Sequence, residues 1–292
     1  MKPSTLPLQL ATPLSQTFVE SLLHPRDAFS HKGMFGHALL IAGNTGKMGA
    51  VLLAAKACLR SGVGLVTVNI LPKTFAIVQT ALPEAMCVSR TSAINFEIYA
   101  AIGIGPGLGT YEAANKLVLD ILVNATQLLV IDADALNCIA LKAGNNCLDK
   151  IPSNAVITPH PKEFDRLFGN HTNDAERWAT AIKASNDYGF VIVLKGHHTL
   201  IAHEGKAWYN ITGNAGMAKG GSGDVLTGMV TAFLAQGYSV INAALLGVYL
   251  HGLAGDITLQ TQAMESMLPS DLIENIGNAF KQLRTQLRHR QR

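Results

Sequence analysis

Residues 213–228 read Gly213-Asn-Ala-Gly-Met-Ala-Lys-Gly-Gly-Ser-Gly-Asp224-Val-Leu-Thr-Gly228, and the pattern of the sequence changes at this stretch. Before it, short apolar runs of strand type alternate with segments of helical length, whereas only helical patterns follow it. Strands that are apolar on both faces and alternate with helices are typical of a mainly parallel sheet covered by helices on each side. The chain is therefore predicted to be an α/β protein.

Seven apolar runs before residue 213 are predicted to be strands: Ala38–Ala42, Leu65–Asn69, Ala100–Ile104, Leu128–Ile131, Ala155–Ile157, Val191–Leu194 and Thr199–Ala202. Helices are expected at Gly49–Ser61, Tyr111–Asn124, Ala175–Tyr188, Asp224–Gln236, Val240–Asp256 and Pro269–Leu287. No linker-like composition or internal repeat interrupts this order, so we expect one domain over residues 1–292. Residues 1–30 are expected to form an arm or helix that packs on it, and residues 281–292 a basic tail.

Composition and charge exclude several classes of protein. With 48% hydrophobic and 15% charged residues, the chain is not of the disordered type. Five of its 23 Lys and Arg lie in residues 281–292. The rest of the chain then has 18 Lys and Arg against 20 Asp and Glu, a net charge of about −2. The formal net charge of +3 therefore belongs to the tail and does not indicate a nucleic-acid partner.

The cellular location is inferred from cysteines and apolar runs. Cys58, Cys87, Cys138 and Cys147 lack disulfide or metal-site spacing, and three of them lie in segments expected in the core, which indicates a reducing compartment. The N-terminus is too polar for a signal peptide, and we expect no apolar run of the roughly 20 residues that a membrane span needs. A cytoplasmic protein without membrane contact is expected.

The glycine-rich stretch has the features of a phosphate site. Gly220, Gly221 and Gly223 allow backbone N–H groups to turn inward, and the helix that begins there adds unpaired N–H groups and its positive dipole end. Asp224, in the first turn, is placed to take a proton from a hydroxyl that attacks a phosphoryl group. The structural alternative is that Ser222 or Asp224 only caps the helix.

A second glycine-rich turn, Gly103-Ile-Gly-Pro-Gly-Leu-Gly109, follows a predicted strand and precedes a helix. Ligands of parallel α/β sheets bind at this edge. Leu108 and Thr110 stand where a dinucleotide fingerprint needs glycine, and Gly46-Lys47-Met48 lacks the Ser or Thr of a P-loop. Dinucleotide-binding dehydrogenases and P-loop nucleotidases are therefore disfavoured.

Two further strand ends carry candidate ligand residues. His160, in Thr158-Pro-His-Pro-Lys-Glu163, stands between two prolines without an evident packing reason and is expected to contact a ligand. In Leu194-Lys-Gly-His-His-Thr199, Lys195 can meet phosphate as a point charge. His197 and His198 are adjacent and expected to point apart, which argues against a metal pair.

Three other polar residues have less definite assignments. Asp134, in Asp132-Ala-Asp134 after a predicted strand, fits a helix cap and an active-site role equally well. His251 and Asp256 lie in an apolar helix and are expected to be satisfied polar groups of the core rather than ligands.

In order along the chain, seven stretches resemble one family, the nucleotide-dependent NAD(P)H-hydrate dehydratases of the ribokinase-like superfamily. They are HKGMFGHALLIAG, MGAVLLAAKACLRSGVGLVTV, GIGPGLG, LVIDADALN, ITPHPKEFDRLFG, IVLKGHHTLIA and NITGNAGMAKGGSGDVLTGM, from about residue 31 to the final helices. The resemblance implies a ribokinase-like three-layer sandwich that forms a dehydratase unit, without the epimerase domain fused to it in some relatives.

The resemblance also implies a reaction. A lyase of this family phosphorylates the C6 hydroxyl of the S-form of hydrated NADH or NADPH (NADHX or NADPHX) and lets phosphate leave, which regenerates NAD(P)H. ADP, converted to AMP, is the expected phosphoryl donor, with ATP as the alternative, and Mg²⁺ is expected to bridge the phosphates. Relatives are often homotetramers, so a homo-oligomer is expected.

Residue roles carried over from the resemblance are expectations. The hydrate would contact Ala50, Gly107, Gly109, His160 and Asp224, and Asp224 and Gly223 would take part in catalysis. The nucleotide would contact Lys195, Gly196, His197, His198, Thr199 and Gly223, while Gly221, Ser222 and Gly223 would form the anion hole. No metal ligand identifies itself. Ala215 stands where the family commonly has proline, and Asn44-Thr45-Gly46 replaces a more usual Gly-Ser pair.

The residues are also consistent with two other functions. The first is a ribokinase-like kinase of a vitamin precursor, of the hydroxyethylthiazole or hydroxymethylpyrimidine type, which would share the Gly-Asp anion hole. The second is a non-catalytic nucleotide sensor on the same fold, against which the presence of Asp224 argues.

Overall fold

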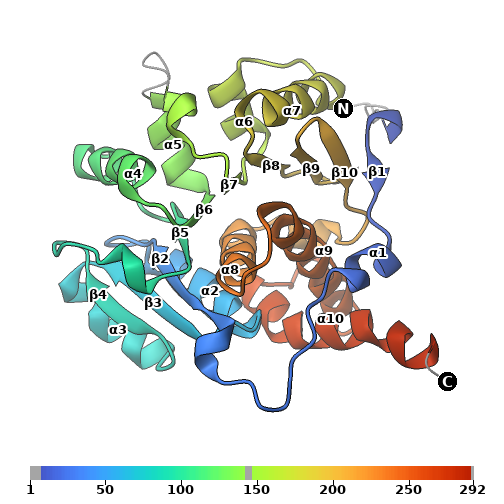
Figure 1. Ribbon diagram of the computed structural model, residues 1–292, viewed down its shortest axis with the longest axis horizontal. Helices are drawn as coiled ribbons and strands as arrows, with labels where there is room; N and C mark the ends of the chain where they lie inside the picture. Colours follow the sequence, from blue (N-terminus) through green and yellow to red (C-terminus); the bar gives the residue numbers. More distant parts are fainter. Residues whose placement is uncertain (1–7, 142–146, 291–292) are drawn as a thin grey trace.

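A computed structural model describes residues 8–141 and 147–290, and in this part of the chain ten strands form one sheet (Figure 1). Their spatial order is β1-β10-β9-β8-β7-β6-β5-β2-β3-β4. Neighbours pair in parallel except where β9 meets β8 and β10. The strands are β1 Thr12–Pro13, β2 His37–Ile41, β3 Leu65–Ile70, β4 Met86–Ser89, β5 Ala101–Ile104, β6 Leu128–Ile131, β7 Ala155–Ile157, β8 Val191–Leu194, β9 Leu200–His203 and β10 Lys206–Tyr209.

Helices cover both faces of the sheet, so the predicted three-layer α/β sandwich is confirmed (Figure 1). One layer holds α4 Glu112–Asn124, α5 Ala133–Leu141, α6 Pro161–Phe168 and α7 Asp174–Tyr188. The other holds α1 Gln16–Ser21, α2 Met48–Arg60, α3 Phe75–Ala81, α8 Ser222–Ala235, α9 Val240–Leu259 and α10 Pro269–Arg290. All seven predicted strands are present, with ends within one residue of those predicted.

The central strands are buried on both faces, as their continuous apolar sequence requires. In β2, Leu40 packs toward α2 and α8 while Leu39 and Ile41 pack toward the opposite helical layer. The sequence analysis missed three strands, β1, β4 and β10, which contain exposed or half-buried residues, unlike the central strands.

Helix α8 lies at the centre of its layer, where every residue from Val225 to Ala235 is buried. Two glycines permit its close packing. A Cβ at Gly228 would overlap the Ala54 carbonyl of α2, and one at Gly103 of β5 would overlap the Thr231 hydroxyl of α8. These contacts determine where α8 lies along the sheet, and therefore where its first turn stands relative to the carboxyl ends of the strands.

Helix α9 corrects one expectation. It is long and apolar enough to cross a membrane by length and composition, with a mean hydropathy of 1.4, although no such segment was expected. However, 67% of that apolar window is buried, and the helix packs against α8 and α10. Such burial is typical of a core helix.

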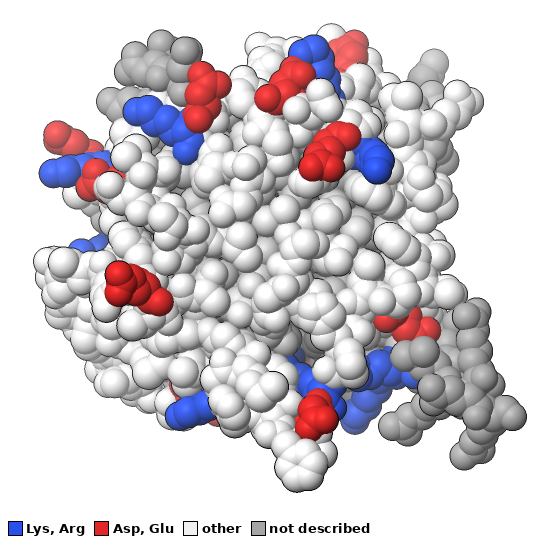
Figure 2. Space-filling view, viewed as in Figure 1, with Lys and Arg blue, Asp and Glu red and all other residues white. Residues whose placement is uncertain are grey.

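The segment before β2 lies against the rest of the fold. Strand β1 pairs with β10, α1 contacts α9 and α10, and Leu14 and Val19 are fully buried. All four cysteines are free, and Cys58, Cys138 and Cys147 are buried as expected. On the face drawn in Figure 2, charged side chains are widely spaced, with both signs interspersed.

Candidate active site

A cavity of about 770 Å³ opens at the carboxyl ends of β6, β7 and β8 and is closed by the glycine-rich stretch and the first turn of α8. This is where ligands of parallel α/β sheets bind. Most of the predicted site residues line it: His160, Lys195, Gly196, His197, Thr199, Gly221, Ser222, Gly223 and Asp224. The cavity thus brings together segments separated by more than sixty positions in the sequence.

The first turn of α8 is open to an anion. Gly221 occupies the N-cap position in the left-handed conformation, with φ of 102°, and no side chain caps the described helix. Ser222, Gly223 and Asp224 follow inside the first turn. The alternative that Ser222 or Asp224 is a simple N-cap is therefore wrong, and the N–H groups and dipole of this helix end face the cavity.

Asp224 has the protonation behaviour of a general base. Burial raises the pKa of its carboxyl to about 7, and the negative charges of Asp132 and Asp134 add to this effect while Lys195 opposes it. A base whose pKa lies near the working pH combines a sizeable deprotonated fraction with strong proton affinity. Asp224 is thus equipped to receive a proton at neutral pH.

Two residues that the sequence analysis did not assign hold Lys195 in place. Its Nζ lies 2.7 Å from Oδ1 of Asp132, a side chain that is only 1% exposed. The Thr227 hydroxyl donates to the other carboxylate oxygen at 2.8 Å. A Cβ at Gly223 would lie 3.3 Å from Nζ, so the lysine stands directly beside the first turn of α8. The position of Asp132 at the carboxyl end of a buried strand was the available signal.

The backbone at Ala133 directs Asp132 and Asp134 to different partners. Ala133 has a φ of 47°, a conformation that costs an L-residue on the order of 1 kcal/mol. Asp132 consequently points toward Lys195, whereas Oδ2 of Asp134 accepts from the Gly109 N–H at 2.7 Å and lies 3.5 Å from Nζ of Lys47. Asp134 therefore ties the Gly103–Gly109 turn to the site.

Ala50, Gly107 and Gly109 form a neighbouring wall rather than part of the cavity lining. A Cβ at Gly107 would lie 2.9 Å from Cβ of Ala50, so the turn after β5 packs directly on the start of α2. The charge of Asp134, which holds this turn, raises the pKa of Asp224. The two groups of residues are thus adjacent at the same edge of the sheet.

His160 is the N-cap of α6, a structural role that the sequence analysis did not assign to it. Its Nδ1 accepts from the backbone N–H groups of Lys162 and Glu163 at 3.1 and 3.2 Å, and Glu163 accepts from the His160 N–H at 2.9 Å. Because Nδ1 accepts, the neutral ring carries its proton on Nε2. Burial, then the charges of Lys195 and Arg166, lowers the pKa of this ring. Nε2 lies 3.3 Å from Oε1 of Glu163, and 44% of the His160 side chain is exposed, so the ring can also contact a ligand.

The adjacent histidines behave differently from the expectation. Their ring centroids lie 4.5 Å apart, so the prediction that they point apart is wrong. They occupy the turn between β8 and β9, where strand alternation does not apply. His197 lines the cavity, whereas His198 does not, and its Nδ1 lies 3.1 Å from the carbonyl oxygen of Asn210. The described residues contain no cluster of three metal-binding side chains.

His251 and Asp256 support the glycine-rich stretch. Nε2 of His251 lies 3.0 Å from the carbonyl oxygen of Ser222, and burial lowers the pKa of its ring to about 4, so the ring is neutral and donates. His251 also lines the cavity, which was not expected. Asp256 accepts from the Gly213 N–H and from Nδ2 of Asn214 at 2.8 and 3.1 Å, and is a satisfied polar group as predicted.

Comparisons with known proteins agree on one family. Residues 38–278 match the family described as NAD(P)H-hydrate dehydratase. A bifunctional NAD(P)H-hydrate repair enzyme of Vibrio cholerae is 39% identical over 262 residues, which cover 88% of this chain and 52% of that protein. The chain thus spans about half the length of the bifunctional relatives it matches. An ADP-dependent (S)-NAD(P)H-hydrate dehydratase of Bacillus subtilis is 34% identical over 281 residues, which cover 91% of this chain and 97% of that protein.

Solved structures give the same result. The ADP/ATP-dependent NAD(P)H-hydrate dehydratase of Bacillus subtilis, co-crystallised with ATP and Mg²⁺, superposes with a TM-score of 0.82 at 32% identity, covering 94% of this chain and 99% of that one. A hydroxyethylthiazole kinase from Pyrococcus horikoshii has a TM-score of 0.58 at 11% identity and shares the fold alone.

Proposed function

The chain belongs to the NAD(P)H-hydrate dehydratase family, and on that premise we propose that it dehydrates (S)-NADHX and (S)-NADPHX to NADH and NADPH at the expense of ADP or ATP. The observation that carries this proposal is the placement of Asp224. Its carboxyl, with a pKa raised to about 7, stands in the first turn of an uncapped helix that faces a cavity of about 770 Å³.

The proposed reaction has two steps. The C6 hydroxyl of the hydrate gives its proton to Asp224 while its oxygen attacks the terminal phosphoryl group, so that an O–P bond forms and the bond to the leaving nucleotide breaks. The ring nitrogen then helps to expel phosphate by breaking the C6–O bond, and loss of the C5 proton restores the reduced ring. With ADP, the products are AMP, phosphate and the reduced cofactor.

The residues around Asp224 stabilise charge on the phosphoryl group. Backbone N–H groups of Ser222 and Gly223 are preorganised donors, each worth about 3 kcal/mol in comparable sites. Lys195 adds a positive charge that Asp132 and Thr227 hold in position. We assign the nucleotide to Lys195, Gly196, His197, His198, Thr199 and Gly223, and the hydrate to Ala50, Gly107, Gly109, His160 and Asp224.

Magnesium fits this site as a companion of the nucleotide. Three carboxylates line the cavity, but those of Asp132 and Glu163 are already bonded to Lys195 and His160. Such a site suits an ion held mainly by phosphate oxygens and water. When bound, Mg²⁺ would neutralise charge on the phosphates. ADP as preferred donor, a homotetrameric assembly, a cytoplasmic location and a single domain over residues 1–292 remain predictions.

The test is to incubate the protein with hydrated NADH, Mg²⁺ and either ADP or ATP while following the absorbance of the reduced ring. Recovery of NADH with release of phosphate is the expected result. Stable accumulation of a phosphorylated hydrate would instead indicate a kinase. Absence of any reaction with both nucleotides would contradict the proposal, and vitamin-precursor alcohols provide the comparison for a kinase of the hydroxyethylthiazole type.

A further inference from the structure

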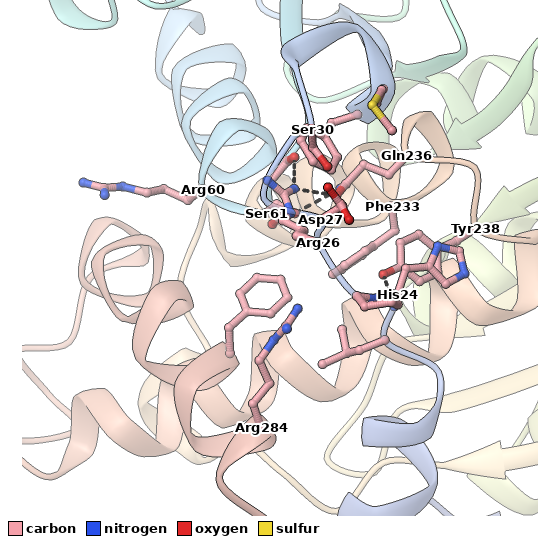
Figure 3. Close-up of a pocket in the computed structure, with 16 residues that line it drawn as sticks. His24, Arg26, Asp27, Ser30, Arg60, Ser61, Phe233, Gln236, Tyr238 and Arg284 are labelled. Carbon is pink, nitrogen blue, oxygen red and sulfur yellow. Dashed lines mark hydrogen bonds between the residues drawn. The ribbon is translucent and has the colours of Figure 1, made fainter. Parts of the chain in front are cut away.

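A second cavity, of about 360 Å³, lies between residues 23–35 and the C-terminal parts of α2, α8 and α10 (Figure 3). Four aromatic side chains line it: Phe35, Phe233, Tyr238 and Phe280. Arg26 and Arg284 are also in the lining, and Figure 3 shows Arg284 reaching toward the cavity while Arg60 points away from it. A cavity of this volume is at the small end of the range for ligand sites, with room for one ring and one attached group.

The two arginines bring positive charge that their neighbours do not balance. Nη2 of Arg26 donates to neutral oxygens, the Gly62 carbonyl and Oε1 of Gln236, and its guanidinium lies 3.8 Å from the centre of the Phe35 ring. Arg284 has no hydrogen bond or ion pair to another described residue. Burial lowers the pKa of Arg26, Tyr238 raises it, and the charge of Arg284 lowers it by a smaller amount. Two cations that repel across one cavity favour an anion between them.

The carboxylates nearby are engaged elsewhere. Asp27 is the only acidic residue among the described lining residues, and its Oδ1 accepts from the backbone N–H of Phe29 at 2.7 Å. Arg60, at the rim, is paired with Glu274 at 3.0 Å. The unbalanced charge therefore belongs to Arg26 and Arg284, which identifies the part of the cavity that would hold an anionic group.

The rest of the lining is a fixed aromatic surface. The rings of His24 and Tyr238 are stacked 3.9 Å apart and within 6° of parallel, and the Tyr238 hydroxyl accepts from the His24 N–H at 2.9 Å. Phe233 meets Tyr238 edge-on at 5.4 Å. Such prepositioned rings favour a planar group that stacks or makes edge contacts.

We propose that this cavity binds a small anion that carries a planar ring, such as an aryl phosphate or aryl carboxylate, with its anionic group between Arg26 and Arg284. The site is separate from the candidate active site. Phe233 and Gln236 lie at the end of α8, whereas Gly223 and Asp224 lie at its start, and a helix of 14 residues is about 21 Å long. The inference does not depend on the proposed enzymatic function.

The experiment uses phenyl phosphate as the probe, with benzoate, inorganic phosphate and benzyl alcohol as comparisons, in calorimetric titrations of the full chain. Arg284→Gln is the test variant, because this exposed side chain makes no described hydrogen bond whose loss would unfold the protein. Arg60→Gln is the matched control. We expect phenyl phosphate to bind more tightly than inorganic phosphate or benzyl alcohol, and Arg284→Gln to weaken it about ten-fold, as for loss of one charged contact. Arg60→Gln should leave the affinity unchanged.

The comparison with benzoate decides which anionic group the site prefers. The anion hole at Gly221–Gly223 can also bind phosphate, so a crystal soaked with phenyl phosphate is needed to show in which of the two cavities the probe binds. Density between Arg26 and Arg284 is the expected result. Density only at the anion hole, no binding at millimolar probe, or equal affinity of the native protein and Arg284→Gln would overturn the proposal.

Discussion

Nζ of Lys195 and Oδ1 of Asp132 lie 2.7 Å apart, so side chains from the ends of β8 and β6 meet across the intervening strand β7, beneath the first turn of α8. Because Asp132 is buried, removal of either partner leaves the charge of the other without a counter-charge. Asp132→Asn is expected to lower turnover at least ten-fold and stability by about 3 kcal/mol, since it leaves the lysine charge unpaired. Thr227→Val removes one hydrogen bond and leaves the pair, so it should cost only about 1 kcal/mol. Chemical denaturation and turnover of both variants measure the difference, and equal effects would contradict the account.

The pH dependence of the reaction should report Asp224. Its pKa is raised to about 7, so the carboxyl is protonated and inactive as a base at lower pH, and kcat/KM should rise with pH through about 7. The charge of Asp132 contributes to this raised pKa, so Asp132→Asn should move the rising limb to lower pH. A pH–rate profile without a limb between pH 5.5 and 8.5, or one that Asp132→Asn shifts upward, argues against this assignment.

The raised pKa of Asp224 also predicts that the folded protein is more stable when this carboxyl carries no negative charge. Asp224 binds its proton more tightly in the folded than in the unfolded state. The stability that this proton contributes is therefore fully present below pH 3.8 and is lost as pH rises through about 7. Since each pKa unit corresponds to about 1.4 kcal/mol, the rise of the pKa from 3.8 to about 7 corresponds to roughly 4 kcal/mol, and Asp224→Asn should raise the free energy of unfolding by up to that amount at pH 8.

Calorimetry at pH 8 and near pH 4 measures this change, with the exposed Asp120→Asn as control. The gain from Asp224→Asn should disappear at the lower pH, while Asp120→Asn should change stability by less than about 0.5 kcal/mol at both. A variant that is less stable than the native protein at pH 8 would show that Asp224 has a structural role instead.

The position of α8 depends on its close contact with α2. A methyl group at Gly228 would overlap the Ala54 carbonyl, so Gly228→Ala is expected to destabilise the protein by about 3 kcal/mol and to lower activity through displacement of the first turn. Gly277→Ala in α10 is the matched control, because nothing lies within 4 Å of its Cβ position. That substitution should stabilise by about 0.5 kcal/mol, as expected for alanine in a helix. Equal Tm shifts would contradict the packing argument.

Much of the fold could be predicted because the central strands are buried on both faces and therefore have apolar sequences. Strand β4 was missed because it lies at the edge of the sheet, where Met86 is exposed and the other residues are half-buried. The anion hole could be predicted from glycines close together in sequence. Asp132 could not be assigned in the same way, since its partners Lys195 and Thr227 are set by tertiary packing 63 and 95 residues away.

The histidines show a different limit of sequence reasoning. The role of His160 as the N-cap of α6 could not be predicted from its sequence, because histidine is an uncommon N-cap residue. The rule that adjacent side chains point apart holds in strands and fails for His197 and His198, which lie in a turn.

The central claim is that Asp224 is the base for phosphoryl transfer. It is tested most directly by measuring ADP binding and the rate of NADH recovery from hydrated NADH for the native protein and for Asp224→Asn. We predict that the variant binds ADP with an affinity within a few-fold of the native value and that its turnover falls about a thousand-fold, as for loss of a general base. Turnover by Asp224→Asn at the native rate would contradict the account.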